Sequence, residues 1–175
     1  MDPIGTLLSQ ARRPDDLATI AIAGVVGMSL RRGRQPLISG LSEARFQKLL
    51  NEYFVGIALS NGEAPASIAD EFDDILELLL EHRAEPTEPA AWLAHAVASA
   101  AMGENHLWQD MGLPSRKHLS ALLQAGFPTL AARNTGDMKW KKFFYRQLCE
   151  RAEVPICKSP HCAECCDYGI CFGPE

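Results

Sequence analysis

Residues 17–30 form the longest apolar segment of the chain, and their burial limits the folds that the chain can adopt. The segment has no charged residue and, as a helix, is apolar around nearly its whole circumference. Such a helix belongs inside a protein, because a surface helix needs a polar face. Its length of about 21 Å falls short of the roughly 30 Å core of a bilayer. We therefore expect a central helix over about 15–32, with Gly24 and Gly27 allowing a neighbour to approach closely.

Helical periodicity also dominates the rest of the chain. Helices are expected at about 42–54, from Ser67 to shortly before Pro86, at 90–102, at 115–126 and at 138–152, with short helical segments or turns near 104–112 and after Phe127. No segment shows the alternation typical of strands, and the residues before Asp15 are expected to form a loose N-terminal arm. The predicted fold class is all-α: a helical bundle with an irregular cysteine-rich C-terminal metal-binding tail. Residues 1–136 would form the bundle, and residues 137–175 a basic helix and a cysteine loop packed on the same domain.

All six cysteines lie between positions 149 and 171. Four of them, Cys157, Cys162, Cys165 and Cys171, follow the spacing C-x4-C-x2-C-x5-C. Thiolates gathered on one short segment can converge on a single soft-metal centre, and an iron–sulfur cluster is the favoured interpretation. The run is too short for two zinc-ribbon knuckles, but a compact zinc site remains an alternative. Disulfides need an oxidising compartment, and no convincing export signal is present, so we expect a cytoplasmic protein.

The charge distribution sets the C-terminal part apart from the rest. The chain carries a net charge of −5, which argues against a nucleic-acid binder. Residues 133–175, in contrast, carry seven basic and six acidic side chains. The basic side chains of the last helix are candidates for docking an anion or a partner, or form a solvated face. They are Lys139, Lys141, Lys142 and Arg146. The acidic residues between Asp70 and Glu77, and the arginines at 31, 32 and 34, are expected to be solvated.

Four further residues are candidates for a metal-related role. His161 and Cys166 lie inside the cysteine run, where either could contact a bound metal or support a ligand, although an exposed loop histidine explains His161 equally well. His106 and Asp110 are four residues apart on an expected helix and could reach one metal, although a local polar contact explains them equally well. No phosphate-binding glycine loop, nucleophile elbow or zinc-protease histidine pair occurs, so we do not expect an enzyme.

The C-terminal part closely resembles the NifQ family of nitrogen-fixation proteins. The resemblance rests on the stretch Asp137-Met-Lys-Trp-Lys-Lys-Phe-Phe-Tyr-Arg146, on the four-cysteine spacing and on the closing Cys171-Phe-Gly-Pro-Glu175. The segment His106-Leu-Trp-Gln-Asp110-Met-Gly-Leu113 and the stretch from Phe127-Pro128 to Asn134-Thr135 are also similar to that family. The match is specific over roughly the last seventy residues and looser before them.

The resemblance implies an iron–sulfur protein that loads molybdenum and passes it on for the iron–molybdenum cofactor of nitrogenase. The cluster ligands would be Cys157, Cys162, Cys165 and Cys171, holding a 3Fe-4S or 4Fe-4S cluster able to take up molybdenum. The implied acceptors are the nitrogenase cofactor scaffold and the iron protein, without nucleic acid or membrane. Two other functions stay open: a helical interaction module with structural zinc, and a simple iron–sulfur electron carrier.

Overall fold

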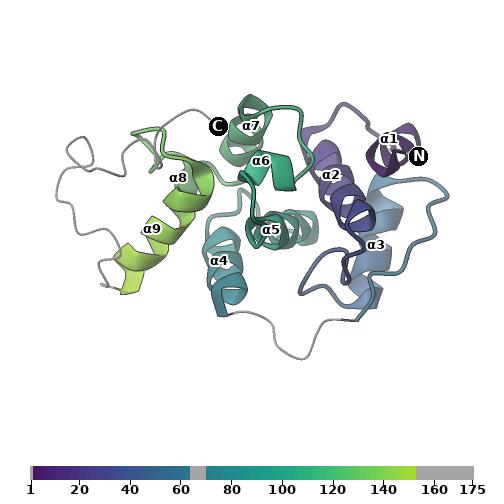
Figure 1. Cartoon of the computed structure of the whole chain (residues 1–175), viewed down its shortest axis with the longest axis horizontal. Helices are drawn as coiled ribbons and strands as arrows, with labels where there is room; N and C mark the ends of the chain where they lie inside the picture. Colours follow the sequence, from purple (N-terminus) through teal and green to yellow (C-terminus); the bar gives the residue numbers. More distant parts are fainter. Residues whose placement is uncertain (1, 64–69, 153–175) are drawn as a thin grey trace.

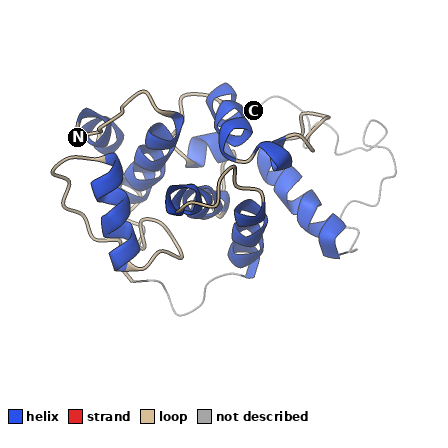
Figure 2. Cartoon of the chain, turned by 180° about the vertical axis from the view of Figure 1, so that it is seen from behind, coloured by secondary structure: helices blue, strands red, loops and turns tan. Residues whose placement is uncertain are grey.

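The computed structural model describes residues 2–63 and 70–152, and these residues form nine helices and no strand. The helices are α1 (Pro3–Ser9), α2 (Leu17–Arg31), α3 (Glu43–Tyr53), α4 (Asp70–Glu81), α5 (Glu88–Ala101), α6 (Leu107–Asp110), α7 (Arg116–Gly126), α8 (Pro128–Ala131) and α9 (Trp140–Ala152). The all-α prediction is confirmed for this part of the chain (Figures 1 and 2). The cysteine-rich tail lies outside the described residues.

Helices α2 and α5 pack against each other and form the middle of the bundle. Asp16 caps α2, since its carboxylate accepts from the backbone N–H of Thr19 at 3.1 Å. The prediction of a buried helix is confirmed, because residues 21–27 are all buried. Nearly all of α5 is buried as well, including the run Ala91–Ala98. Of the described helices, none has the length and apolar character that crossing a membrane requires.

The N-terminal residues are not a loose arm, so that prediction is wrong. Asp2 caps α1, accepting from the backbone N–H groups of Ile4 and Gly5 at 3.2 and 3.1 Å. Leu7 of α1 is buried against α2. The sequence signal for this helix was an aspartate followed by proline at the first helical position, which favours a helix start. Tertiary packing then stabilises a helix that would be too short to persist alone.

The last helix packs at one end of the molecule, while α1 and α3 lie at the other end (Figure 1). α9 contacts α4, whose buried residues Phe72, Ile75, Leu78 and Leu79 recur at helical spacing. The acidic residues of α4 are exposed, as expected. The predicted cap of this helix, Ser67, lies outside the described residues. α9 buries Trp140, Phe143 and Phe144 in the common core, so it is part of the bundle.

Two glycines of α2 set how closely its neighbours approach. A Cβ on Gly24 would lie 2.0 Å from the carbonyl oxygen of Met111, a backbone atom at the end of α6. A Cβ on Gly27 would lie 2.4 Å from Cγ1 of Ile4 in α1. Residues of any other kind at these positions would push α6 or α1 away from α2. The predicted role of both glycines is therefore confirmed.

We predict that Gly24→Ala destabilises the protein by about 1–3 kcal/mol, because the added methyl group meets backbone that has no room to move. Glycine to alanine within an exposed helix would instead stabilise by roughly 0.5–1 kcal/mol. Gly126→Ala is the matched control, since its Cβ would meet only the Cδ2 atom of Leu93 at 2.9 Å. Urea unfolding measures both changes. A Gly24→Ala variant as stable as the wild type would contradict the packing described here.

Candidate metal centre

The predicted ligands of the metal centre lie outside the described residues. This applies to Cys157, Cys162, Cys165 and Cys171, and equally to His161 and Cys166. Within residues 2–63 and 70–152, no group of three or more histidine, cysteine or acidic side chains is placed to hold a metal. What the structure does describe is α9, the helix after which the cysteine-bearing stretch of the sequence begins.

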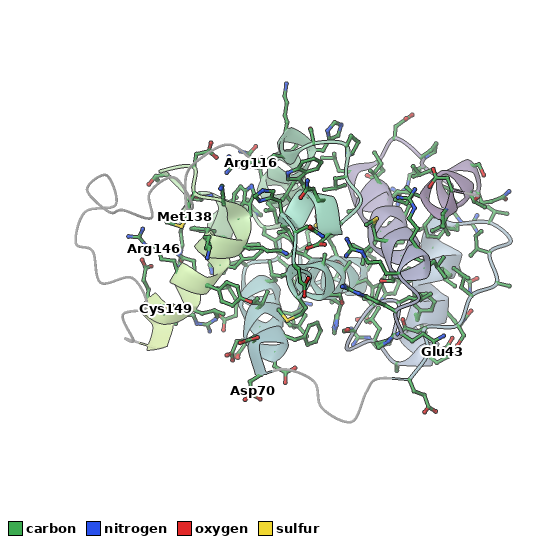
Figure 3. All side chains as sticks on the ribbon, viewed as in Figure 1. Glu43, Asp70, Arg116, Met138, Arg146 and Cys149 are labelled. Atoms are coloured by element: carbon green, nitrogen blue, oxygen red, sulfur yellow. The ribbon has the colours of Figure 1, made fainter. Side chains whose placement is uncertain are left out.

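Cys149 is the cysteine that the structure describes, and its thiol is turned into the protein. It is 9% exposed, and its Sγ donates to the backbone carbonyl of Tyr145, one turn earlier in α9, at 2.8 Å. A thiol in this setting packs as a small apolar side chain. Figure 3 shows Cys149 near the end of α9, beyond Arg146.

The start of α9 is fixed by hydrogen bonds from two other segments. Asn134 makes a reciprocal pair with Met138: its Oδ1 accepts from the Met138 N–H at 2.8 Å, and its Nδ2 donates to the Met138 carbonyl at 2.9 Å. The Nη2 atom of Arg116, from α7, donates to the carbonyls of Asp137 and Met138, each at 3.1 Å. Asp137 has a left-handed backbone, with φ of 53°. Residues 134–137 thus form the turn that leads into α9.

A buried carboxylate fastens α9 to the bundle. Asp110, at the end of α6, has a side chain that is 1% exposed. Its Oδ2 accepts from Lys141 Nζ of α9 at 2.6 Å, and its Oδ1 accepts from Arg32 Nη1, just after α2, at 2.9 Å. The backbone N–H of Asn105 donates to Oδ2 at 3.1 Å. Gly103 makes room for the carboxylate, because a Cβ there would lie 2.3 Å from Oδ2.

These contacts bear on two sequence interpretations. Lys141 and Arg32 engage both carboxylate oxygens of Asp110, so a metal shared with His106 would have to displace two cations. His106 begins α6, where its backbone N–H donates to Gln109 Oε1 at 3.2 Å. Arg32 is exposed at the helix end, as expected, and it also pairs with a carboxylate 78 residues away. No local sequence signal marks that pair.

The charge on Asp110 is maintained by its partners. Burial raises the pKa of this carboxyl, but hydrogen bonds from Lys141 and Arg32 and the charge of Lys141 lower it more, so that the net pKa is below the ordinary 3.8. Lys141 also donates to the backbone carbonyls of Gly103, at 2.8 Å, and Asn105. A buried ion pair is stable only when its remaining hydrogen-bonding capacity is met in this way.

The basic side chains of α9 do not form one exposed face. Lys141 points inward to Asp110, whereas Lys142 is exposed. Lys139 and Arg146 are half-buried, and Arg146 Nε pairs with Glu150 at 3.4 Å. The four side chains predicted to dock an anion or a partner therefore do not act together, because Lys141 forms an ion pair inside the bundle.

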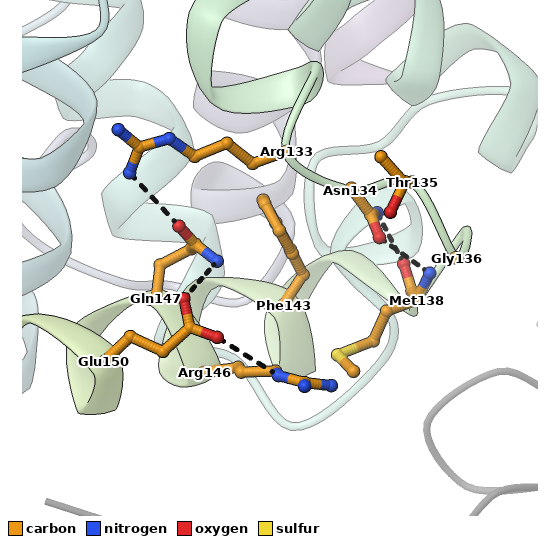
Figure 4. Close-up of a pocket in the computed structure, with 9 residues that line it drawn as sticks. All are labelled: Arg133, Asn134, Thr135, Gly136, Met138, Phe143, Arg146, Gln147 and Glu150. Atoms are coloured by element: carbon orange, nitrogen blue, oxygen red, sulfur yellow. Dashed lines mark hydrogen bonds and ion pairs between the residues drawn. The ribbon is translucent and has the colours of Figure 1, made fainter. Parts of the chain in front are cut away.

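Arg146 also lines a pocket of about 560 Å³ beside α9 (Figure 4). A chain of hydrogen bonds crosses its wall: Arg133 Nη1 donates to Gln147 Oε1 at 3.4 Å, and Gln147 Nε2 donates to Glu150 Oε2 at 3.3 Å. Phe143 supplies an apolar surface. The carboxylate of Glu150 offsets the charge of Arg146, and Arg133 is bonded to Gln147, so both arginines of this pocket are already engaged.

We predict that Lys141→Met destabilises the protein by about 2–3 kcal/mol. This loss is smaller than the roughly 3–5 kcal/mol expected when a buried charge loses its only partner, because Arg32 still faces Asp110. Lys142→Met is the matched control: it removes the same charge from the next residue and should change stability by at most about 0.5 kcal/mol. Urea unfolding at pH 7 measures both. Equal losses in the two variants would show that Lys141 has no special role.

The same ion pair predicts a dependence of stability on pH. Because the folded-state pKa of Asp110 is lowered, its contribution is present above the unfolded value of about 3.8 and is lost as pH falls through the folded pKa. The difference in unfolding free energy between wild type and Asp110→Asn should therefore be largest near neutral pH and shrink below pH 3.8. Denaturant melts of both proteins across this range test it, and a constant difference would contradict the assignment.

Comparisons with known proteins agree with the sequence resemblance. The family model described as NifQ matches residues 20–173. Protein NifQ of Azotobacter vinelandii is 37% identical over 155 residues, covering 80% of each chain, and Protein NifQ of Rhodobacter capsulatus is 38% identical over 161 residues, covering 89% of each. Protein NifQ of Klebsiella pneumoniae is 46% identical over 87 residues, covering 49% of this chain and 52% of its own. No solved structure matches. The chain belongs to the NifQ family of nitrogen-fixation proteins.

Proposed function

We propose that this protein is an iron–sulfur protein that binds molybdenum and donates it for biosynthesis of the nitrogenase iron–molybdenum cofactor. The observation that carries the proposal is the spacing C-x4-C-x2-C-x5-C in a member of the NifQ family. Residues 157–171 contain five cysteines, four of them at this spacing, whereas the first 148 residues contain none, and this concentration indicates a soft-metal site.

The donor set fits an iron–sulfur cluster in its chemistry. Thiolates are the usual protein ligands of such clusters, and Cys157, Cys162, Cys165 and Cys171 would supply four. A cluster of the 3Fe-4S or 4Fe-4S type supplies inorganic sulfide as a soft ligand for an additional metal. Molybdenum is then cargo, and a carrier needs a ligand that exchanges. His161 and Cys166 are the additional candidates for contact with molybdenum.

The described residues support this function by holding the helix that precedes the cysteines. Asp110, Lys141 and the aromatic core fix α9, so that the chain enters the cysteine stretch from a rigid helix. Cys149 is hydrogen-bonded inside that helix and is not proposed as a ligand. The exposed Lys142, with Lys139 and Arg146, offers positive charge for an acidic partner.

The proposed acceptors are the nitrogenase cofactor scaffold and the iron protein, in the cytoplasm. The protein would act by transfer of its cargo and not as an enzyme that turns over a substrate. A structural zinc site is the main alternative from the sequence, and an electron carrier is the other. Metal content separates the three: iron with molybdenum for the donor, iron without molybdenum for the electron carrier, and zinc without iron for the structural module.

We predict that protein purified without oxygen contains iron and acid-labile sulfide and absorbs broadly in the visible range. Cys162→Ser and Cys165→Ser should each lose most of the iron, because a missing thiolate leaves the cluster without a ligand. Cys149→Ser is the matched control and should keep its iron, while Cys166→Ser should lose much less than the two ligand variants. Colorimetric iron and sulfide assays measure all four. Iron-free protein that contains zinc, or equal iron loss at Cys166, would contradict the proposal.

A further inference from the structure

A second pocket, of about 510 Å³, lies between the end of α2 and the end of α5. Its apolar wall includes Val25, Met28 and Met102. Its polar lining includes Arg32, Arg34, Ser39, Ser99 and Asp110. It shares no lining residue with the pocket beside α9.

The end of α2 places both arginines at this pocket. Gly33 adopts φ of 60°, a left-handed conformation that suits glycine. The N–H of Gly33 donates to the carbonyl of Leu30 at 3.2 Å, and the N–H of Arg34 donates to that of Ser29 at 2.9 Å. This is the Schellman arrangement, in which the chain turns back over the helix end. It brings Arg34 to the same pocket as Arg32, two residues earlier.

The pocket has an excess of positive charge. Asp110 is the acidic residue of its lining, and its two oxygens are already engaged by Arg32 and by Lys141. Arg32 uses Nη1 for that bond, so that its guanidinium is oriented by a fixed carboxylate. In the part of the chain that the structure describes, Arg34 has no side-chain hydrogen bond or ion pair. The charged side chains of the lining, Arg32, Arg34 and Asp110, sum to about +1.

We propose that this pocket binds a tetrahedral oxyanion with two negative charges. Its physiological ligand would be molybdate, a choice that rests on the proposed function. Arginine presents planar N–H donors that suit oxyanions, and charge-assisted bonds of this kind are stronger than neutral ones. Val25, Met28 and Met102 line the pocket beside these donors. A metal cation would be repelled by the same arginines. Molybdenum dissolved in oxygenated water is an oxyanion, so such a site would collect it before any transfer to sulfur ligands.

The network connects this pocket to α9. Arg32 shares the carboxylate of Asp110 with Lys141, which belongs to the helix that leads into the cysteine stretch. Arg32 of the proposed oxyanion site and Lys141 of the helix before the cysteines therefore bind the same buried carboxylate. The oxyanion site is nevertheless complete without any cysteine, so the two can be tested apart.

Isothermal titration of the full chain with sodium molybdate, in buffer free of sulfate and phosphate, tests the proposal. Arg34→Gln should weaken molybdate binding by about tenfold or more, the usual effect of losing hydrogen bonds to a charged group. Arg31→Gln is the matched control: it removes one arginine charge from the same helix end, but Arg31 does not line the pocket and pairs with Asp2. Its molybdate affinity should stay within about twofold, since exposed charges contribute little.

The same titration in a Cys162→Ser background separates this inference from the proposed function. Molybdate binding that depends on Arg34 should persist there, even though that variant is expected to lack iron. Three results would overturn the inference: no binding at millimolar molybdate, equal weakening by Arg34→Gln and Arg31→Gln, or loss of binding with Cys162. Tighter binding of sulfate or phosphate than of molybdate would overturn the choice of ligand. An iron-free wild type that still binds molybdate through Arg34 would contradict the proposed function and leave this inference standing.

Discussion

The carboxylate of Asp110 is the contact on which the arrangement of this protein depends. It is almost fully buried, and it joins the end of α2, the turn before α6 and the start of α9 through Arg32, Asn105 and Lys141. Removing a charged group from water costs several kcal/mol, so it stays buried only while its partners remain in place. Because the partners come from segments far apart in the sequence, the ion pairs favour one packing of α9 over others.

The helices could be predicted from the sequence because their signals are local. Ser42, Thr87 and Ser115 cap α3, α5 and α7 through their own side chains, and the apolar spacing of α4 matches its buried face. α1 was missed because a seven-residue helix has almost no periodicity to detect. It packs against α2, where Ile4 lies close to Gly27, and this is a tertiary contact.

The network around Asp110 could not be predicted, for a physical reason. Asp110 and Arg32 are separated by 78 residues, and Lys141 follows 31 residues after Asp110. In the sequence Lys141 looks like its neighbour Lys142, since both belong to one basic helix. Only the direction of each side chain, which depends on how α9 packs, distinguishes the buried ion pair from the exposed charge. The spacing of the cysteines, by contrast, is a local pattern and identified the candidate ligands directly.

Helix α9 is the part of the fold that is adjacent in sequence to the proposed metal ligands. One side of this helix is fixed by aromatic packing and by Lys141, and the sequence that follows it carries the thiols. Arg32, on the other side of the same carboxylate, belongs to a cationic pocket suited to an oxyanion. A protein that handles molybdenum needs to accept it as an oxyanion and to hold it with sulfur. The two proposed sites divide these tasks between arginines of the bundle and cysteines of the C-terminal stretch.

X-ray absorption at the molybdenum edge tests this account most directly, on iron-loaded protein incubated with molybdate and reductant without oxygen and then freed of unbound metal. The account predicts molybdenum with sulfur neighbours, and loss of that signal in Cys165→Ser. Molybdenum surrounded by oxygen alone, with the same spectrum in wild type and Cys165→Ser, would contradict it.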